Sequence, residues 1–86
     1  MTRYISIRAI CGDRRKRLPM DYGYISVVIY NPNLNRNITN IQNWIIENIE
    51  GSWTFWEFGD NHSGGRTYAF LLAEEATLFK LIWAND

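Results

Sequence analysis

The chain has 86 residues, of which 47% are hydrophobic and 15% aromatic, and its formal net charge is zero. This length predicts a single domain over residues 1–86, small enough that a partner or a second copy would add stability. No apolar run reaches the roughly 20 residues of a membrane-spanning helix, and one cysteine, Cys11, excludes both an intramolecular disulfide and a cysteine-based zinc site within one chain.

The N-terminal ten residues, MTRYISIRAI, alternate and contain two arginines, which is unlike a secretory signal peptide. With the single cysteine, this favours an intracellular protein. Residues 3–10 are predicted to form a half-buried strand, because apolar side chains recur at every second position. One face would carry Ile5, Ile7 and Ala9, and the other Tyr4, Ser6, Arg8 and Ile10.

Residues 11–23 are predicted to form a long loop, which in so small a domain is typically functional or mobile. The loop carries four adjacent cations, Arg14, Arg15, Lys16 and Arg17. Residues 1–17 contain six basic residues against Asp13, a net charge of +5, and residues 18–86 balance it with −5. A basic head on an acidic body can pair with polyanions, with an acidic protein or with another copy.

The rest of the chain alternates between strand and helix patterns. Residues 24–30 read as a strand with β-branched Ile25, Val27 and Ile29 on one face, ended by Asn31-Pro32-Asn33. Residues 38–50 read as a helix, because apolar residues follow one stripe. An aromatic strand at 53–58, a glycine-containing turn at 59–66, a strand at 67–72 and a helix at 73–84 complete the chain.

The order ββαββα predicts an α+β single domain with a permuted ferredoxin-like, four-stranded antiparallel sheet and two helices on one face. The expected strand order is 3–10, 24–30, 67–72, 53–59. The other sheet face would be open and would present Tyr4, Arg8, Tyr24, Tyr30 and one aromatic pair of strand 53–58, either Trp53 and Phe55 or Trp56 and Phe58. Tyrosine, tryptophan and arginine are typical of binding hot spots. The alternative is that loop 11–23 covers the edge strand and that the exposed aromatics are incidental.

Three other functions can be weighed from the residues. The cations at 14–17 beside tyrosines match the charge-and-stacking surface of single-stranded nucleic-acid binders, although the neutral net charge argues against strong electrostatic binding. The same face could instead form a homodimer. His62, between Asp60 and Ser63, is the candidate for acid-base chemistry, but a glycine-flanked turn is too loose for a catalytic triad, and one histidine with one carboxylate is too few ligands for zinc. We therefore expect no enzyme activity, metal or cofactor.

From about residue 38 onward, the segments NWIIENIEG, SWTFWEF and YAFLLAEEATLFKLIW form a pattern that resembles small uncharacterised proteins of tailed bacteriophages. The resemblance covers about half of the chain, has Glu75 where those proteins have aspartate, and transfers no catalytic residue. It implies a phage protein in the cytoplasm of a bacterial host, of the class that binds and blocks a host complex such as a defence nuclease. The partner-binding residues expected from the open sheet face and the basic loop are Tyr4, Arg8, Arg14, Arg15, Lys16, Arg17, Tyr24, Tyr30 and Trp56.

Overall fold

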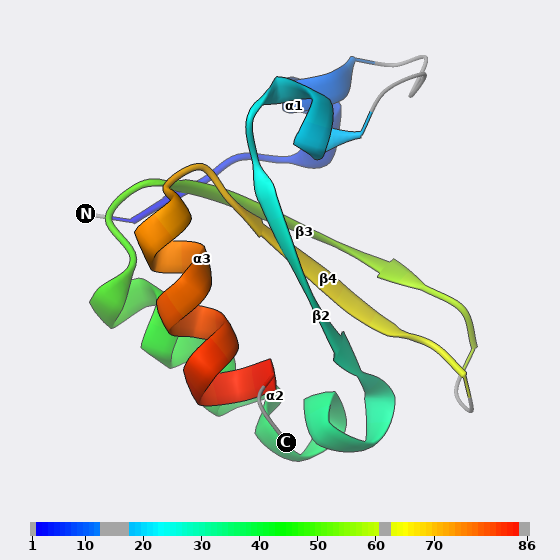
Figure 1. The fold of residues 1–86 in the computed structure, drawn as a ribbon. Helices are drawn as coiled ribbons and strands as arrows, with labels where there is room; N and C mark the ends of the chain where they lie inside the picture. The colour runs from blue at the N-terminus through cyan, green and yellow to red at the C-terminus, as the bar shows by residue number, and fades with distance from the viewer. Residues whose placement is uncertain (1, 13–17, 61–62, 85–86) are drawn as a thin grey trace.

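The structure is a computed structural model that describes residues 2–12, 18–60 and 63–84. Its strands are β1 Arg3–Tyr4, β2 Ile25–Tyr30, β3 Ser52–Phe58 and β4 Gly65–Phe70, and its α-helices are α1 Ile7–Cys11, α2 Asn31–Asn48 and α3 Ala73–Phe79 (Figure 1). A 3₁₀ turn, η1 Pro19–Tyr22, precedes β2, and a π-helical turn, η2 Lys80–Ala84, extends α3.

The four strands form one mixed sheet in the order β1-β3-β4-β2. β4 runs antiparallel to both β2 and β3, so β2 and β3 are parallel with β4 inserted between them, as the sequence predicted. Helices α2 and α3 lie on the same face of the sheet (Figure 1). The prediction of an α+β, ferredoxin-like arrangement is confirmed.

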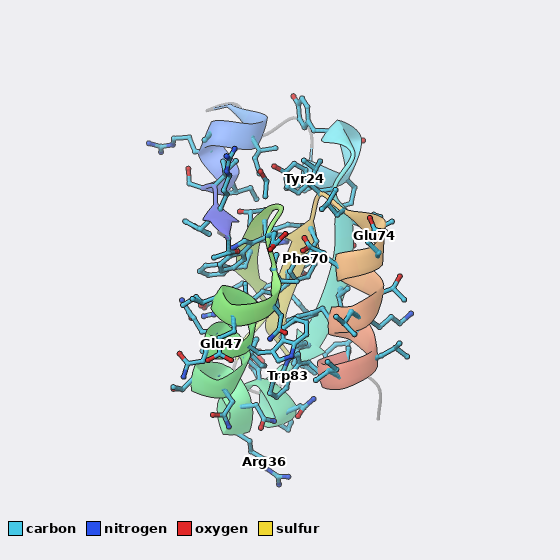
Figure 2. The ribbon with its side chains drawn as sticks, turned by 90° about the vertical axis from the view of Figure 1, so that its left-hand side faces the viewer. Tyr24, Arg36, Glu47, Phe70, Glu74 and Trp83 are labelled. Atoms are coloured by element: carbon cyan, nitrogen blue, oxygen red, sulfur yellow. The ribbon has the colours of Figure 1, made fainter. Side chains whose placement is uncertain are left out.

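The core lies between this helical layer and the sheet. Strand residues Val27, Ile29 and Phe70 meet Ile41 and Ile45 of α2 in a single buried cluster. Figure 2 shows Phe70 and Trp83 in the space between α2 and α3, while Arg36 points away from the body of the protein. The apolar stripe predicted for α2 therefore packs against β-branched residues of β2, and this packing holds a helix whose isoleucines have only moderate helix propensity.

Helix α2 begins seven residues earlier than predicted. Pro32, expected to end a strand and open a loop, occupies the first turn of the helix instead. Proline is tolerated there, because the first N–H groups of a helix have no partner within the helix and the proline ring already holds a helical φ. The Asn31 N–H, one of these unpaired donors, bonds the carbonyl of Gly64 at 3.0 Å.

The predicted first strand is wrong in length and position. Only Arg3 and Tyr4 are in a strand, which pairs in parallel with β3 at the opposite edge of the sheet from β2. Ser6 then caps α1 by accepting a hydrogen bond from the Ala9 N–H at 3.3 Å. The second half of the alternating segment 3–10 is therefore helical rather than extended. At this edge the Tyr4 ring contacts the rings of Trp53 and Phe55, with centroids 5.1 and 5.6 Å away.

Candidate functional site

Strand β3 turns its two aromatic pairs to opposite faces of the sheet. In the register with β4, Trp53 and Phe55 lie beside Phe70 and Tyr68 on the helix-covered face. Trp56 and Phe58 consequently lie on the face turned away from α2 and α3, which we call the distal face. This settles which pair joins the surface anticipated from the sequence.

Part of the distal face is covered. At the end where β2 begins, Thr54 and Ala69 are fully buried although they point away from α2 and α3. At that end α1 contacts β3 and η1 contacts β2, so these are the described elements that cover it (Figure 1). Tyr24 is buried there as well, at 8% exposure, and its predicted place on an open face is wrong. Residues of the predicted loop 11–23 therefore cover this end of β2 through η1, whereas the alternative had that loop cover the predicted first strand.

The other end of the distal face carries a contiguous apolar surface. Tyr30 is 62% exposed and Val28 is exposed, and both lie on β2. Trp56 and Phe58 are half-buried on β3, with Thr67 and Gly65 of β4 between the two pairs of side chains. The Tyr30 and Phe58 rings meet edge to face, with centroids 6.2 Å apart. We call the set Val28, Tyr30, Trp56 and Phe58 the distal patch.

Among the described residues expected to bind a partner, the structure brings together Tyr30 and Trp56. Tyr4 is exposed, but its pairing with Trp53 places it on the helix-covered side. Arg8 lies in α1 rather than on a strand, so its predicted place on the sheet face is also wrong. The four cations at 14–17 and the candidate base His62 lie outside the described residues. Phe58 lies beside Tyr30 and Trp56, and the sequence had paired it with Trp56 as one of two alternatives because the two residues alternate along the strand.

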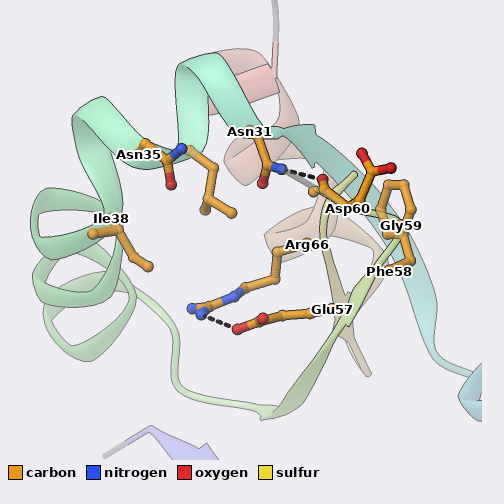
Figure 3. A pocket seen from close by; sticks show the side chains of 10 residues that line it. Asn31, Asn35, Ile38, Glu57, Phe58, Gly59, Asp60 and Arg66 are labelled. Carbon is orange, nitrogen blue, oxygen red and sulfur yellow. Dashed lines mark hydrogen bonds and ion pairs between the residues drawn. The ribbon is translucent and has the colours of Figure 1, made fainter. Parts of the chain in front are cut away.

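A second feature is a polar pocket of about 400 Å³ between the first turns of α2 and the β3–β4 hairpin (Figure 3). Arg66 points into it from β4, and its side chain is only 11% exposed. The guanidinium donates to Glu57 Oε1 at 2.8 Å and to the Tyr68 hydroxyl at 3.3 Å, and it lies 4.4 Å from the centre of the Phe55 ring. The sequence did not single out this arginine, because the pattern placed it at the end of the turn 59–66, whereas in the structure β4 begins at Gly65.

The electrostatics of this pocket are those of a structural ion pair. Burial lowers the pKa of Arg66, but the hydrogen bonds from its guanidinium to Glu57 and Tyr68 more than offset this, and the net shift is upward. Burial raises the pKa of Tyr68, against a smaller opposite effect of Arg66. Both groups therefore keep their ordinary protonation state near neutral pH, and Glu57 balances the charge of Arg66.

At the hairpin end of this pocket, the described residues form hydrogen bonds. Asn31 donates its side-chain amide to the Asp60 carbonyl at 2.7 Å, and Asp60 Oδ1 accepts from the N–H and hydroxyl of Ser63. These bonds shape the hairpin turn. Within residues 2–12, 18–60 and 63–84, no group of three or more histidine, cysteine, aspartate or glutamate side chains is placed to hold a metal ion.

Comparisons with protein families, with curated proteins and with solved structures found no match. Among the described residues, no helix combines the length and the apolar character needed to cross a membrane. The resemblance of the C-terminal half to phage proteins therefore stays a prediction, and the function has to be argued from the surface itself.

Proposed function

We propose that this domain is a non-enzymatic interaction protein that binds a protein partner through the distal patch. The observation that carries the proposal is the exposure of Tyr30 and Val28 beside half-buried Trp56 and Phe58. These side chains project from β2 and β3, which both pair with β4, so they need little ordering on binding. Rigid aromatic anchors on a fixed frame are typical of hot spots.

The resemblance of the C-terminal half to tailed-phage proteins supports a more specific form of this proposal. In that form the partner is a bacterial host complex, such as a defence nuclease, and binding blocks it. The basic residues 14–17 would steer the encounter with an acidic partner, because like-signed clusters act mainly on the association rate. Binding of single-stranded nucleic acid through the same cations is the competing hypothesis.

The test is capture of a partner from bacterial lysate by the tagged domain, with and without nuclease. The informative variant is Tyr30→Asp, which places a charge in the distal patch at a site exposed enough to spare the fold. Its matched control is Leu81→Asp, since Leu81 on η2 is 61% exposed and Tyr30 is 62% exposed. Both variants should unfold at temperatures close to that of the wild type.

We expect one stoichiometric protein that survives nuclease, binds the wild type and Leu81→Asp, and binds Tyr30→Asp at least about tenfold more weakly, as loss of a hot-spot residue implies. Equal binding of that protein by both variants would remove the distal patch from the proposal. A captured set that disappears on nuclease treatment would instead favour the nucleic-acid hypothesis.

A further inference from the structure

The polar pocket between α2 and the β3–β4 hairpin has the dimensions of a small-molecule site. Its volume of about 400 Å³ lies toward the lower end of the roughly 300–1,000 Å³ that is typical of such sites. Leu34 and Ile38 of α2 line it with apolar groups, while Arg66 and Glu57 reach it from the sheet (Figure 3). These four residues belong to a helix or to paired strands, which hold a site more firmly than loops do.

The guanidinium of Arg66 is buried but does not use all of its hydrogen-bond donors. Arg66 is 9% exposed, and of its five N–H groups two donate to side chains, one to Glu57 and one to the Tyr68 hydroxyl. Its Nε has no partner among the described residues. A buried donor without an acceptor is unfavourable, because it has lost its water and gained no bond in return. The guanidinium therefore favours a further acceptor in the pocket.

Two other groups in the pocket also have unused hydrogen-bonding capacity. Glu57 bonds Arg66 through Oε1, which leaves Oε2 free to accept. The Asn35 side chain makes no hydrogen bond within the described part of the chain, and its amide can both donate and accept. The pocket thus presents donors and an acceptor of the ion pair side by side, with an amide across from them on α2 (Figure 3).

The charges around the pocket disfavour a charged ligand. Glu57 already balances Arg66, and Asp60 adds a second carboxylate to the lining. A phosphate or carboxylate group would meet two negative side chains against one positive side chain. A cation would lie beside the guanidinium, which is held in place by its burial. A neutral ligand meets neither repulsion.

We propose that this pocket binds a neutral heterocycle that carries an N–H group next to a C=O group, as uracil and hypoxanthine do, in the form of a free base or nucleoside. The C=O accepts from the Arg66 guanidinium and the N–H donates to Glu57. A guanidinium beside a carboxylate presents a donor beside an acceptor, which is the complement of that ligand edge. Leu34 and Ile38 contact the ring, and Asn35 bonds a second polar group of the ligand. The inference uses none of the residues of the distal patch, so it does not depend on the proposed function.

The test is a titration of the isotope-labelled domain with uridine and with inosine, followed by NMR. The control for each probe is the derivative that is methylated at the N–H nitrogen. We expect saturable shifts of the Arg66 Nε–H signal and of the backbone amides of Gly59 and Gly65, which line the pocket. The methylated derivatives should bind at least about tenfold more weakly, because a site that bonds an N–H group rejects an analogue that lacks it.

The variant Asn35→Ala tests the pocket from the side of α2. Asn35 is exposed, so alanine spares the fold, and we expect binding about fivefold weaker, as for the loss of one hydrogen bond between neutral groups. Asn43→Ala is the matched control, because Asn43 is exposed on the same helix and does not line the pocket, and it should bind like the wild type. Equal binding by the two variants would overturn the proposal. The absence of a saturable shift with either nucleoside, or equal binding of the methylated derivatives, would overturn it as well.

Two other outcomes would give the site or the ligand a different identity. Shifts confined to Val28, Tyr30 and Trp56 would place the nucleoside on the distal patch and overturn its assignment to the pocket. Tighter binding of a single-stranded oligouridylate than of uridine, with shifts at the pocket, would assign the site to nucleic acid and overturn the free nucleoside. Failure of nucleoside binding leaves the capture of a protein partner by the distal patch unchanged, so the two proposals fail separately.

Discussion

The two side chains of the ion pair between Glu57 and Arg66 differ in burial. This difference predicts how much stability each loses when its partner is removed. The arginine side chain is 11% exposed and the glutamate side chain is 67% exposed, with 2.8 Å between their bonded atoms. Removing the glutamate leaves a largely buried cation whose Nε already has no hydrogen-bond partner among the described residues. Removing the arginine leaves a carboxylate that water can solvate. The cost of losing Glu57 should therefore depend on whether the arginine is present.

The magnitude follows from the strength of hydrogen bonds to charged groups, about 1.5–3 kcal/mol each. Because Glu57 is mostly exposed, solvent screening places this pair at the lower end of that range, and we expect Glu57→Ala to lower the free energy of unfolding by about 2 kcal/mol. In an Arg66→Met background, the same substitution should cost about 0.5 kcal/mol or less, as at an ordinary surface site. Methionine retains apolar contact with Phe55.

Urea unfolding at neutral pH, followed by circular dichroism, measures the four corners of this double-mutant cycle. Glu47→Ala on the exposed surface of α2 is the control and should change stability by about 0.5 kcal/mol at most. Equal costs of Glu57→Ala in the two backgrounds would refute the reasoning, because they would show that the buried guanidinium does not depend on its carboxylate.

Two further predictions concern a capping carboxylate and a buried phenol. Glu75 accepts the N–H groups of Glu50 at 2.8 Å and Gly51 at 3.0 Å, so it ties α3 to the end of α2. Glu75→Gln should lower the free energy of unfolding by about 1 kcal/mol, because the amide keeps one acceptor oxygen; unchanged urea curves would contradict this bridge. Burial raises the pKa of Tyr68 above its ordinary value of 10.0, so the folded state favours the neutral phenol. Stability from this group is complete below pH 10 and is lost as the pH rises through the raised pKa. Tyr68→Phe should flatten the decline above about pH 10, whereas Tyr22→Phe, at an exposed site, should not; identical declines in all three proteins would count against a shifted Tyr68.

Prediction from the sequence succeeded where one face of an element is buried. The β-branched stripe of β2 and the apolar stripe of α2 both lie in the core, and β4 lies between two parallel strands. Prediction from the sequence failed where one residue is compatible with two local structures. Pro32 reads equally as a turn residue or as the first turn of a helix, and the structure uses the second.

The candidate site was foreseen in part. The aromatic residues Tyr30 and Trp56 share the distal face as expected, because alternation along a strand predicts which residues share a face. It was not foreseeable that Tyr4 lies on the other face and that Tyr24 is covered on this one. It depends on which edge β1 joins and on where η1 packs, and neither is encoded in a local pattern.

The sequence by itself determined the α+β class, three of the four strands, and the placement of α2 and α3 on one face of the sheet. These features follow from hydrophobic periodicity and chain connectivity, which act over short stretches. Only the tertiary structure decided that β1 joins β3 at Ser52 and Trp53, and that Arg66 is buried on Phe55 beside Glu57. Each of these depends on contacts between segments or across strands, where the relative stability of alternative packings, rather than any local preference, selects the arrangement.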